Sequence, residues 1–203
     1  MADISFDTLA EELRLDIPGM VDALAVREVR NAAIDFCNRT RCWKFEQDTI
    51  TTSTETEYDM EPPSGSVVSE VIRVKYAANV LEGKPYEVLL DYATNSTMYY
   101  GVLNPRVLKL AGTPVADKTL DVMVALKPSI SSRRIEDYIY EEYSEVFRHG
   151  ALARLFAMAG KPWTNTTLSG YHSSEYESAV TTATTKCETG GVRTAHTVKY
   201  GGL

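Results

Sequence analysis

The sequence lacks any uninterrupted apolar run of the roughly 18 residues needed to cross a membrane. Its N-terminal segment carries acidic residues where a secretory signal peptide would have a basic region followed by an apolar one. These absences predict a soluble protein that is made and kept in a cytoplasm. Only three cysteines are present, Cys37, Cys42 and Cys187, and their spacing fits no disulfide framework, so we expect free thiols.

Recognisable catalytic motifs are also missing. The three histidines, His149, His172 and His196, form no His-Glu-x-x-His pattern, and Cys37 and Cys42 lie too far apart for a zinc knuckle. The sequence has no glycine-rich dinucleotide turn after a strand and no Gly-x-Ser-x-Gly nucleophile elbow. We therefore predict that the protein is not an enzyme and uses no cofactor or metal, and that His149 is a packed or surface residue.

Basic residues are absent between positions 46 and 61, where several acidic residues lie close together. Because hard cations bind carboxylates, a metal-dependent nuclease built on this run is one hypothesis. The spacing and the glycine of an EF-hand loop are missing, so we favour a solvated negative surface. The acidic residues of the run are Glu46, Asp48, Glu55, Glu57, Asp59 and Glu61.

The charge balance of the 203-residue chain is acidic, with 21 Lys and Arg against 28 Asp and Glu and a net charge of −7. A protein of this charge is poorly suited to gripping nucleic acid phosphates over its whole surface, and self-repulsion favours its solubility. The length predicts one domain, or one domain that carries an insertion. The 44% hydrophobic content excludes a disordered chain, because it suffices for a core of useful size.

Apolar residues recur with a helical period in the N-terminal and C-terminal parts of the chain. We predict a short helix over residues 8–15, capped by Asp7, and a longer one over 20–37. The period returns later in the chain and predicts a helix over 135–160 and another over 165–190. The apolar stripes of these helices predict a bundle core that contains Phe36, Ile139, Val146 and Phe147.

Between the helical parts the apolar period changes to two, which is typical of half-buried strands. Turn-forming Pro, Gly, Asn and Asp residues separate the runs. Short strands at such a spacing indicate an antiparallel sandwich or a small barrel. The predicted strands cover residues 49–56, 67–77, 86–92, 106–111 and 119–127.

The whole pattern predicts an α+β fold, in which an antiparallel helical bundle carries an inserted antiparallel β-sandwich or barrel-like domain and an extended C-terminal arm. The bundle comprises residues 1–43 and 132–190, the β-domain residues 44–131 and the arm residues 191–203. From Val192 onward the sequence has no helical stripe, no acidic residue and a strand-like alternation. Such a segment can add to the sheet edge of a neighbour or lie in a groove between subunits, and the alternative is a frayed terminus.

Four strings of residues follow one another along the chain. They are residues 33–43 (AIDFCNRTRCW), 58–63 with 68–71 (YDMEPP and VSEV), 126–129 (LKPS), and 150–155 with 161–163 (GALARL and KPW). In that order they resemble the head-to-tail adaptor (connector) proteins of tailed bacteriophages, akin to tail tubular protein A of short-tailed phages. The resemblance extends over about residues 20–190, and its specificity lies in the joint order of the strings.

The resemblance implies a structural virion protein at the head–tail junction, assembled in the cytoplasm of a bacterial host. Family members form rings, usually dodecamers, beneath the portal and extend the channel through which double-stranded DNA passes. The implied partners are other copies of the chain, the portal protein, a downstream tail or nozzle protein and DNA that passes without specific binding, with no membrane. Family members dock on the portal with a C-terminal arm, whose residues here would be Arg193, His196, Val198, Lys199 and Tyr200.

A second hypothesis is a protein- or carbohydrate-binding β-module mounted on a helical bundle. The two hypotheses differ in the mass that they predict. A connector subunit assembles into a large ring, either alone or with a portal, whereas a binding module need not assemble at all. The tyrosine content, 12 of 203 residues, suits protein interfaces, and the alternative is ordinary half-buried residues of the sheet.

Overall fold

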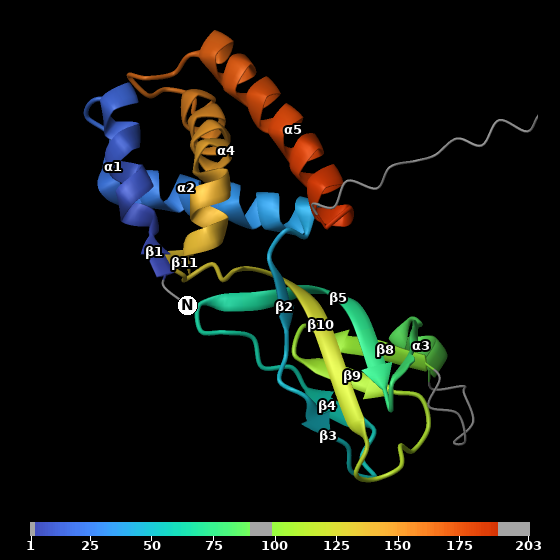
Figure 1. The fold of residues 1–203 in the computed structure, drawn as a ribbon. Helices are drawn as coiled ribbons and strands as arrows, with labels where there is room; N and C mark the ends of the chain where they lie inside the picture. The colour runs from blue at the N-terminus through green and yellow to red at the C-terminus, as the bar shows by residue number, and fades with distance from the viewer. Residues whose placement is uncertain (1–2, 90–98, 191–203) are drawn as a thin grey trace, which may run out of the picture.

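The computed structural model describes residues 3–89 and 99–190. Four long helices lie together at one end of the molecule and most strands lie at the other (Figure 1). The fold is mixed α+β with mainly antiparallel sheets, which confirms the predicted class at this level. No helix within the described ranges is long and apolar enough to span a membrane. The long helices are α1 (Phe6–Asp16), α2 (Asp22–Thr40), α4 (Asp137–Phe156) and α5 (Thr166–Glu188).

Helix α1 begins two residues before the predicted start, because Ser5 caps it instead of Asp7. The Oγ of Ser5 accepts a hydrogen bond from the Asp7 amide at 3.2 Å. Ser5 ends the short strand β1 (Asp3–Ser5), and its backbone is therefore already extended, as a capping residue requires. Asp7 lies in the first turn instead, where a negative charge interacts favourably with the helix dipole.

A two-stranded sheet that the sequence pattern did not predict joins the N-terminal segment to the start of α4. β1 pairs antiparallel with β11 (Arg134–Glu136), and Ile4 lies opposite Ile135. Ile135 therefore belongs to a strand, and the prediction that the helix includes it is wrong. Strands of three residues are too short to show a period in the sequence.

The four long helices pack on one another through their apolar faces. α2 contacts α1, α4 and α5, and α4 contacts α5 as well. The ring of Phe36 lies 4.7 Å from the ring of Tyr143 and 5.4 Å from that of Phe147, measured between centroids. Phe36, Ile139 and Phe147 are fully buried, whereas Val146 is only partly buried at the margin of the core.

Most strands form two sheets, and every pairing among the described residues of these sheets is antiparallel except that of β7 with β8. The first sheet has the order β2-β10-β5-β6, with β3 also paired to β10, and the second has the order β4-β9-β8-β7. The strands of the first sheet are β2 (Lys44–Glu46), β3 (Ile50–Thr51), β5 (Ser66–Tyr76), β6 (Asn79–Val80) and β10 (Thr119–Pro128). Those of the second are β4 (Glu57–Asp59), β7 (Glu82–Gly83), β8 (Tyr99–Asn104) and β9 (Val107–Leu110).

The two longest strands, β5 and β10, pair at the centre of the first sheet. Their alternation predicts strands at both positions, and the structure confirms this. Each places alternate apolar side chains into the core, while the residues between them are more exposed. The buried members of this set are Val68, Val74, Leu120, Val122, Val124 and Leu126.

The prediction of a strand over residues 86–92 is wrong. The run begins with a single-turn helix, α3 (Tyr86–Leu89), and residues 90–92 lie outside the described ranges. Pro85 precedes this turn, and its carbonyl accepts a hydrogen bond from the Leu89 amide at 3.3 Å. The fixed backbone angle of proline suits the start of a helical turn, which here buries Leu89.

The predicted strand over residues 49–56 pairs with β10 only at Ile50 and Thr51. The next residue, Thr52, is 2% exposed, and its Oγ1 donates a hydrogen bond to the Val115 carbonyl at 2.8 Å. Its amide binds the Lys118 carbonyl, also at 2.8 Å. Because Thr52 is tied to the loop before β10, the chain leaves the first sheet here, and β4 begins in the second sheet.

The chain passes between the helices and the sheets at two neighbouring points (Figure 1). β2 follows α2, and α4 follows β10 and β11. β2 and β10 pair with each other, so that Lys44 lies opposite Ala125. β10 also contacts α2, and Arg41 at the end of α2 forms an ion pair with Glu70 of β5 at 2.7 Å.

Candidate functional site

The residues proposed from the sequence to dock on a portal, Arg193, His196, Val198, Lys199 and Tyr200, lie outside the described residues. The described chain ends at Gly190, just after α5. The candidate site is therefore the point from which this C-terminal segment departs. We call the last turn of α5 and the following residues, 184–190, the arm base.

Helix α5 carries the arm base, and polar side chains bind its backbone toward both ends. Asn165 caps its start, and its Oδ1 accepts hydrogen bonds from the amides of Thr167 and Leu168 at 3.1 Å. Toward its C-terminal end, threonine hydroxyls donate to the carbonyl four residues earlier, which satisfies the hydroxyls but slightly weakens a helix. These residues are Thr181, Thr182, Thr184, Thr185 and Thr189.

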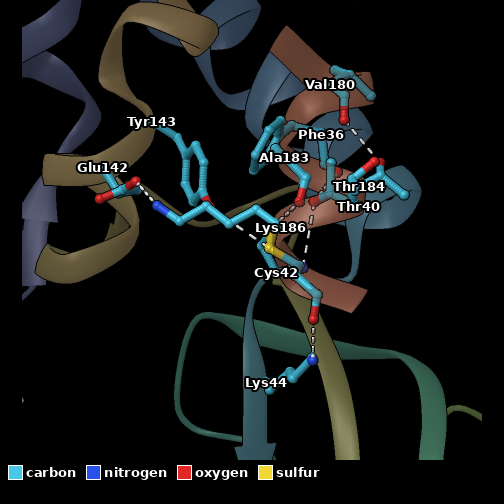
Figure 2. Close-up of a disulfide and its surroundings, with 12 residues drawn as sticks. Phe36, Thr40, Cys42, Lys44, Glu142, Tyr143, Val180, Ala183, Thr184 and Lys186 are labelled. Atoms are coloured by element: carbon cyan, nitrogen blue, oxygen red, sulfur yellow. Dashed lines mark hydrogen bonds and ion pairs between the residues drawn. A yellow bond between two sulfur atoms is a disulfide. The ribbon is translucent and has the colours of Figure 1, made fainter. Parts of the chain in front are cut away.

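A disulfide joins Cys187 in the arm base to Cys42, which lies two residues after the end of α2 (Figure 2). The expectation of free thiols is therefore wrong for these two residues. Their Cα atoms are 5.2 Å apart, within the usual range for a disulfide. The cysteines are 145 residues apart in sequence, and only the packing of α5 against α2 brings them together. Cys187 lies near the end of a predicted helix, but Cys42 lies five residues beyond the predicted end of another, so the sequence pattern did not pair them.

The third cysteine, Cys37, is free and fully buried in α2. Burial raises the pKa of its thiol to about 12. The thiol therefore stays protonated at neutral pH and is a poor nucleophile. Cys37 is a small apolar residue of the core, as the sequence pattern indicates.

Polar contacts from two further elements surround the disulfide (Figure 2). The Nζ of Lys44, in β2, donates a hydrogen bond to the Cys187 carbonyl at 2.6 Å. Lys186 forms an ion pair with Glu142 of α4. The hydroxyl of Tyr143, also in α4, lies 3.6 Å from the Cys187 sulfur. The arm base is thus held by α2, α4 and β2 together, next to the junction between the helices and the sheets.

A second set of contacts holds the middle of α5 against α2 and α4. Arg39 donates two hydrogen bonds to Glu177, at 2.8 and 2.5 Å, and these bonds lower the pKa of Glu177. The Tyr176 hydroxyl donates to Asp35 at 2.8 Å, and burial raises the pKa of Tyr176 far above its ordinary value. Arg154 of α4 lies 3.5 Å from the same Asp35 carboxylate.

Two histidines meet between α4 and α5, away from the arm base. The Nδ1 atoms of His149 and His172 are 2.9 Å apart, and the ring of His172 stacks on Phe156. Burial, together with the nearby His149 and Arg148, lowers the pKa of His172. The prediction for His149 is a packed or surface residue, and the structure places it partly buried in this contact.

The acidic run from Glu46 to Glu61 is divided between several elements. Glu46 lies 3.6 Å from Arg73, and Glu57 lies 3.1 Å from Lys109. Across residues 3–89 and 99–190, no group of three or more His, Cys, Asp or Glu side chains is arranged to hold a metal ion.

Comparison of the chain with protein-family models and with curated proteins gave no match.

Proposed function

We propose that the chain is a subunit of an adaptor ring that connects the portal of a tailed-bacteriophage head to the tail. The observation that carries this proposal is the joint order of the four sequence strings that resemble such adaptors. The α+β fold supports it, because the strand-rich segment lies in sequence between two helical segments, and the family that the chain resembles has a helical bundle that carries a β-domain. In this proposal residues 1–43 and 132–190 form the bundle, 44–131 the inserted β-domain and 191–203 the arm.

The acidic charge supports a role around moving DNA. A net charge of −7 on each subunit would keep phosphates from binding to the wall of a channel. A closed ring needs two different, complementary faces on each subunit, since its interface is heterologous. The proposed partners are other copies of the chain in a dodecameric ring, the portal, a downstream tail or nozzle protein and DNA, which is retained and later ejected through the channel.

The arm base supports a docking function for the residues that follow it. A segment that attaches a ring to a portal must transmit load to the body of the subunit. The Cys42–Cys187 disulfide and the contacts of Lys44 and Lys186 would distribute such a load over α2, α4 and β2. The proposed location of the ring is the head–tail junction of the virion.

The test compares the full chain with a variant that lacks residues 192–203. Each is mixed with heads of the parent phage that carry a portal but no adaptor, and electron microscopy then examines the portal vertex. The full chain should add a ring-shaped density there, and the shortened chain should remain folded by circular dichroism but fail to bind. Heads that bind neither protein would contradict the adaptor function, and equal binding by both would contradict the role of the arm.

A second candidate function, a protein- or carbohydrate-binding module, is favoured by one observation. A cleft of about 440 Å³ lies between β5 and β8, and Tyr86 and Tyr100 line it together with Glu70. Tyrosines with nearby polar groups suit both kinds of ligand. Binding of an oligosaccharide or peptide by the full chain, with no assembly in the presence of heads, would favour this function over the adaptor.

A further inference from the structure

One edge of β5 has no strand beside it over most of its length, within the part of the chain that the structure describes. β10 pairs with β5 from Ser66 to Tyr76 on one side, whereas on the other side β6 pairs only with Lys75 and Tyr76. Beyond Tyr100, the described residues of β8 likewise pair with β9 alone. The N–H and C=O groups of such an edge form a template for a further strand.

A cleft with apolar walls runs along this edge. Its central part, of about 440 Å³, separates Val68 and Val71 of β5 from Tyr100 and Val102 of β8. Val102 is 36% exposed, and Ile72, the next residue of β5, is 37% exposed. Apolar side chains exposed beside an unpaired edge favour an added strand that brings apolar side chains of its own.

The cleft continues to the arm base. Glu70 and Val71 also line a neighbouring hollow of about 240 Å³, whose other wall contains Cys187 and Glu188 of α5. Arg41 and Lys44 line the same hollow, and a chain that leaves α5 at Gly190 therefore begins near Glu70 and Val71 of β5. From this point it can follow the edge toward Ser66, which is antiparallel to β5.

The cleft also continues beyond the other end of the edge. Val68 and Pro105 are shared with a third hollow, of about 410 Å³, which extends to Glu61 and Pro62. We call these three connected hollows the β5 cleft. It begins at the end of α5 and passes along the unpaired edge of β5 as far as the segment that precedes this strand.

We propose that the β5 cleft is a docking site for residues 192–199 of the same chain, which add to β5 as an antiparallel strand. These residues lie outside the described ranges. They are long enough to cover β5 from Ile72 to Ser66, because a strand rises about 3.3 Å per residue. Alternate residues have the β-branched or aromatic character that strands favour: Val192, Thr194, His196 and Val198.

The two basic residues of the segment would lie near acidic residues at the two ends of the β5 cleft. The segment carries Arg193 near its start and Lys199 near its end, and no acidic residue. Glu188 and Glu70 line the beginning of the β5 cleft, and Glu61 lies at the far end. The cleft also has basic residues of its own. Arg41 is ion-paired with Glu70, Lys44 donates a hydrogen bond to the Cys187 carbonyl, Lys84 is ion-paired with Glu82, and Arg106 lies at the far end.

The docked strand has a consequence for assembly, and this consequence alone rests on the proposed adaptor function. A segment that lies in the β5 cleft is not available to a portal. The free subunit would therefore hold its arm on its own sheet, and release of the arm would be a step in attachment to the head. The docking itself is a property of the free subunit and can be tested without a portal.

The test measures amide hydrogen exchange by mass spectrometry in the full chain at two concentrations that differ tenfold. The wild type is compared with the double variant Thr194→Pro/Val198→Pro, because proline removes the N–H groups that a strand needs. A matched control, Gly201→Pro, introduces proline beyond the docked residues. Light scattering reports the mass of each protein, and peptides from β10 give an internal reference for exchange within the sheet.

We expect the amides of residues 67–72 that do not pair with β10 to exchange about tenfold or more faster in the double variant than in the wild type and the control. The effect should be the same at both concentrations, with a monomeric mass. Equal, fast exchange in all three proteins would overturn the proposal, because residues 192–199 would then not protect the β5 edge. The edge would instead be available to another protein. Protection that appears only with a dimeric mass would also overturn it, because the occupant would then be a second copy.

Discussion

Removal of the Cys42–Cys187 disulfide should lower the free energy of unfolding by about 2–5 kcal/mol. The bond closes a loop of 145 residues, which comprises most of the chain. In the chain-entropy account, closing a loop of this length restricts the unfolded ensemble by about 5 kcal/mol at 25 °C. A loss nearer to about 2 kcal/mol is the usual result when the unfolded chain retains structure or when the contacts around the bond adjust.

The assay follows urea unfolding of the wild type with and without a phosphine reductant. With a denaturant slope of roughly 2 kcal/mol per molar urea, the predicted loss moves the midpoint by about 1–2.5 M. The double variant Cys42→Ala/Cys187→Ala is the control, and the reductant should not change its midpoint. Its own midpoint should match that of the reduced wild type within the small effect of the two removed thiol groups.

Alkylation tests the pairing directly. In denaturant without reductant, an alkylating reagent should modify only Cys37, and after reduction it should modify all three cysteines. The protein must be natively folded before the denaturant is added. Modification of all three cysteines in denaturant before reduction would then refute the assignment of the disulfide. An unchanged urea midpoint after proven reduction would refute the energetic argument and leave the pairing intact.

Three further predictions concern the helices. Phe147→Ala should lower the unfolding free energy by about 3–5 kcal/mol in urea titrations, because the side chain is fully buried, and an unchanged midpoint would contradict its place in the core. Gly150→Ala should lose about 1–3 kcal/mol, since its Cβ would lie 2.7 Å from a ring carbon of Tyr176, whereas Gly170→Ala, with open space at its Cβ, should be neutral or gain up to about 1 kcal/mol. Because the pKa of His172 is lowered in the folded state, the unfolded chain binds its proton more readily, and stability should fall as the pH drops below about 6.5. The variant His172→Gln should show a weaker loss over the same pH range, and identical pH profiles would contradict this role.

The long elements could be predicted from the sequence because their burial patterns repeat over many residues. The apolar stripe of α2 and the alternation of β10 each extend over several periods, so single exceptions do not obscure them. The predicted positions of helix ends were less accurate, because a cap depends on the local backbone conformation as well as on the residue type. Ser5 replaced Asp7 as the cap of α1 for this reason.

The short and the distant features could not be predicted. β1 and β11 have three residues each, and α3 has four, which is too few for a period to appear. Thr52 has the composition of a strand residue, yet its hydroxyl binds a carbonyl of the loop before β10. The candidate site depended on a contact between Cys42 and Cys187 that arises only when α5 packs on α2.

The pairing of β2 with β10 also matters for how such a chain can change during evolution. Because these strands are neighbours, the segment between them starts and finishes at almost the same place. A segment whose two ends meet can gain or lose loops, or be exchanged for another of different size, while the paths of α2 and α4 stay the same. The size and loops of this segment could therefore change during evolution, while the arrangement of the helices and their disulfide stays the same.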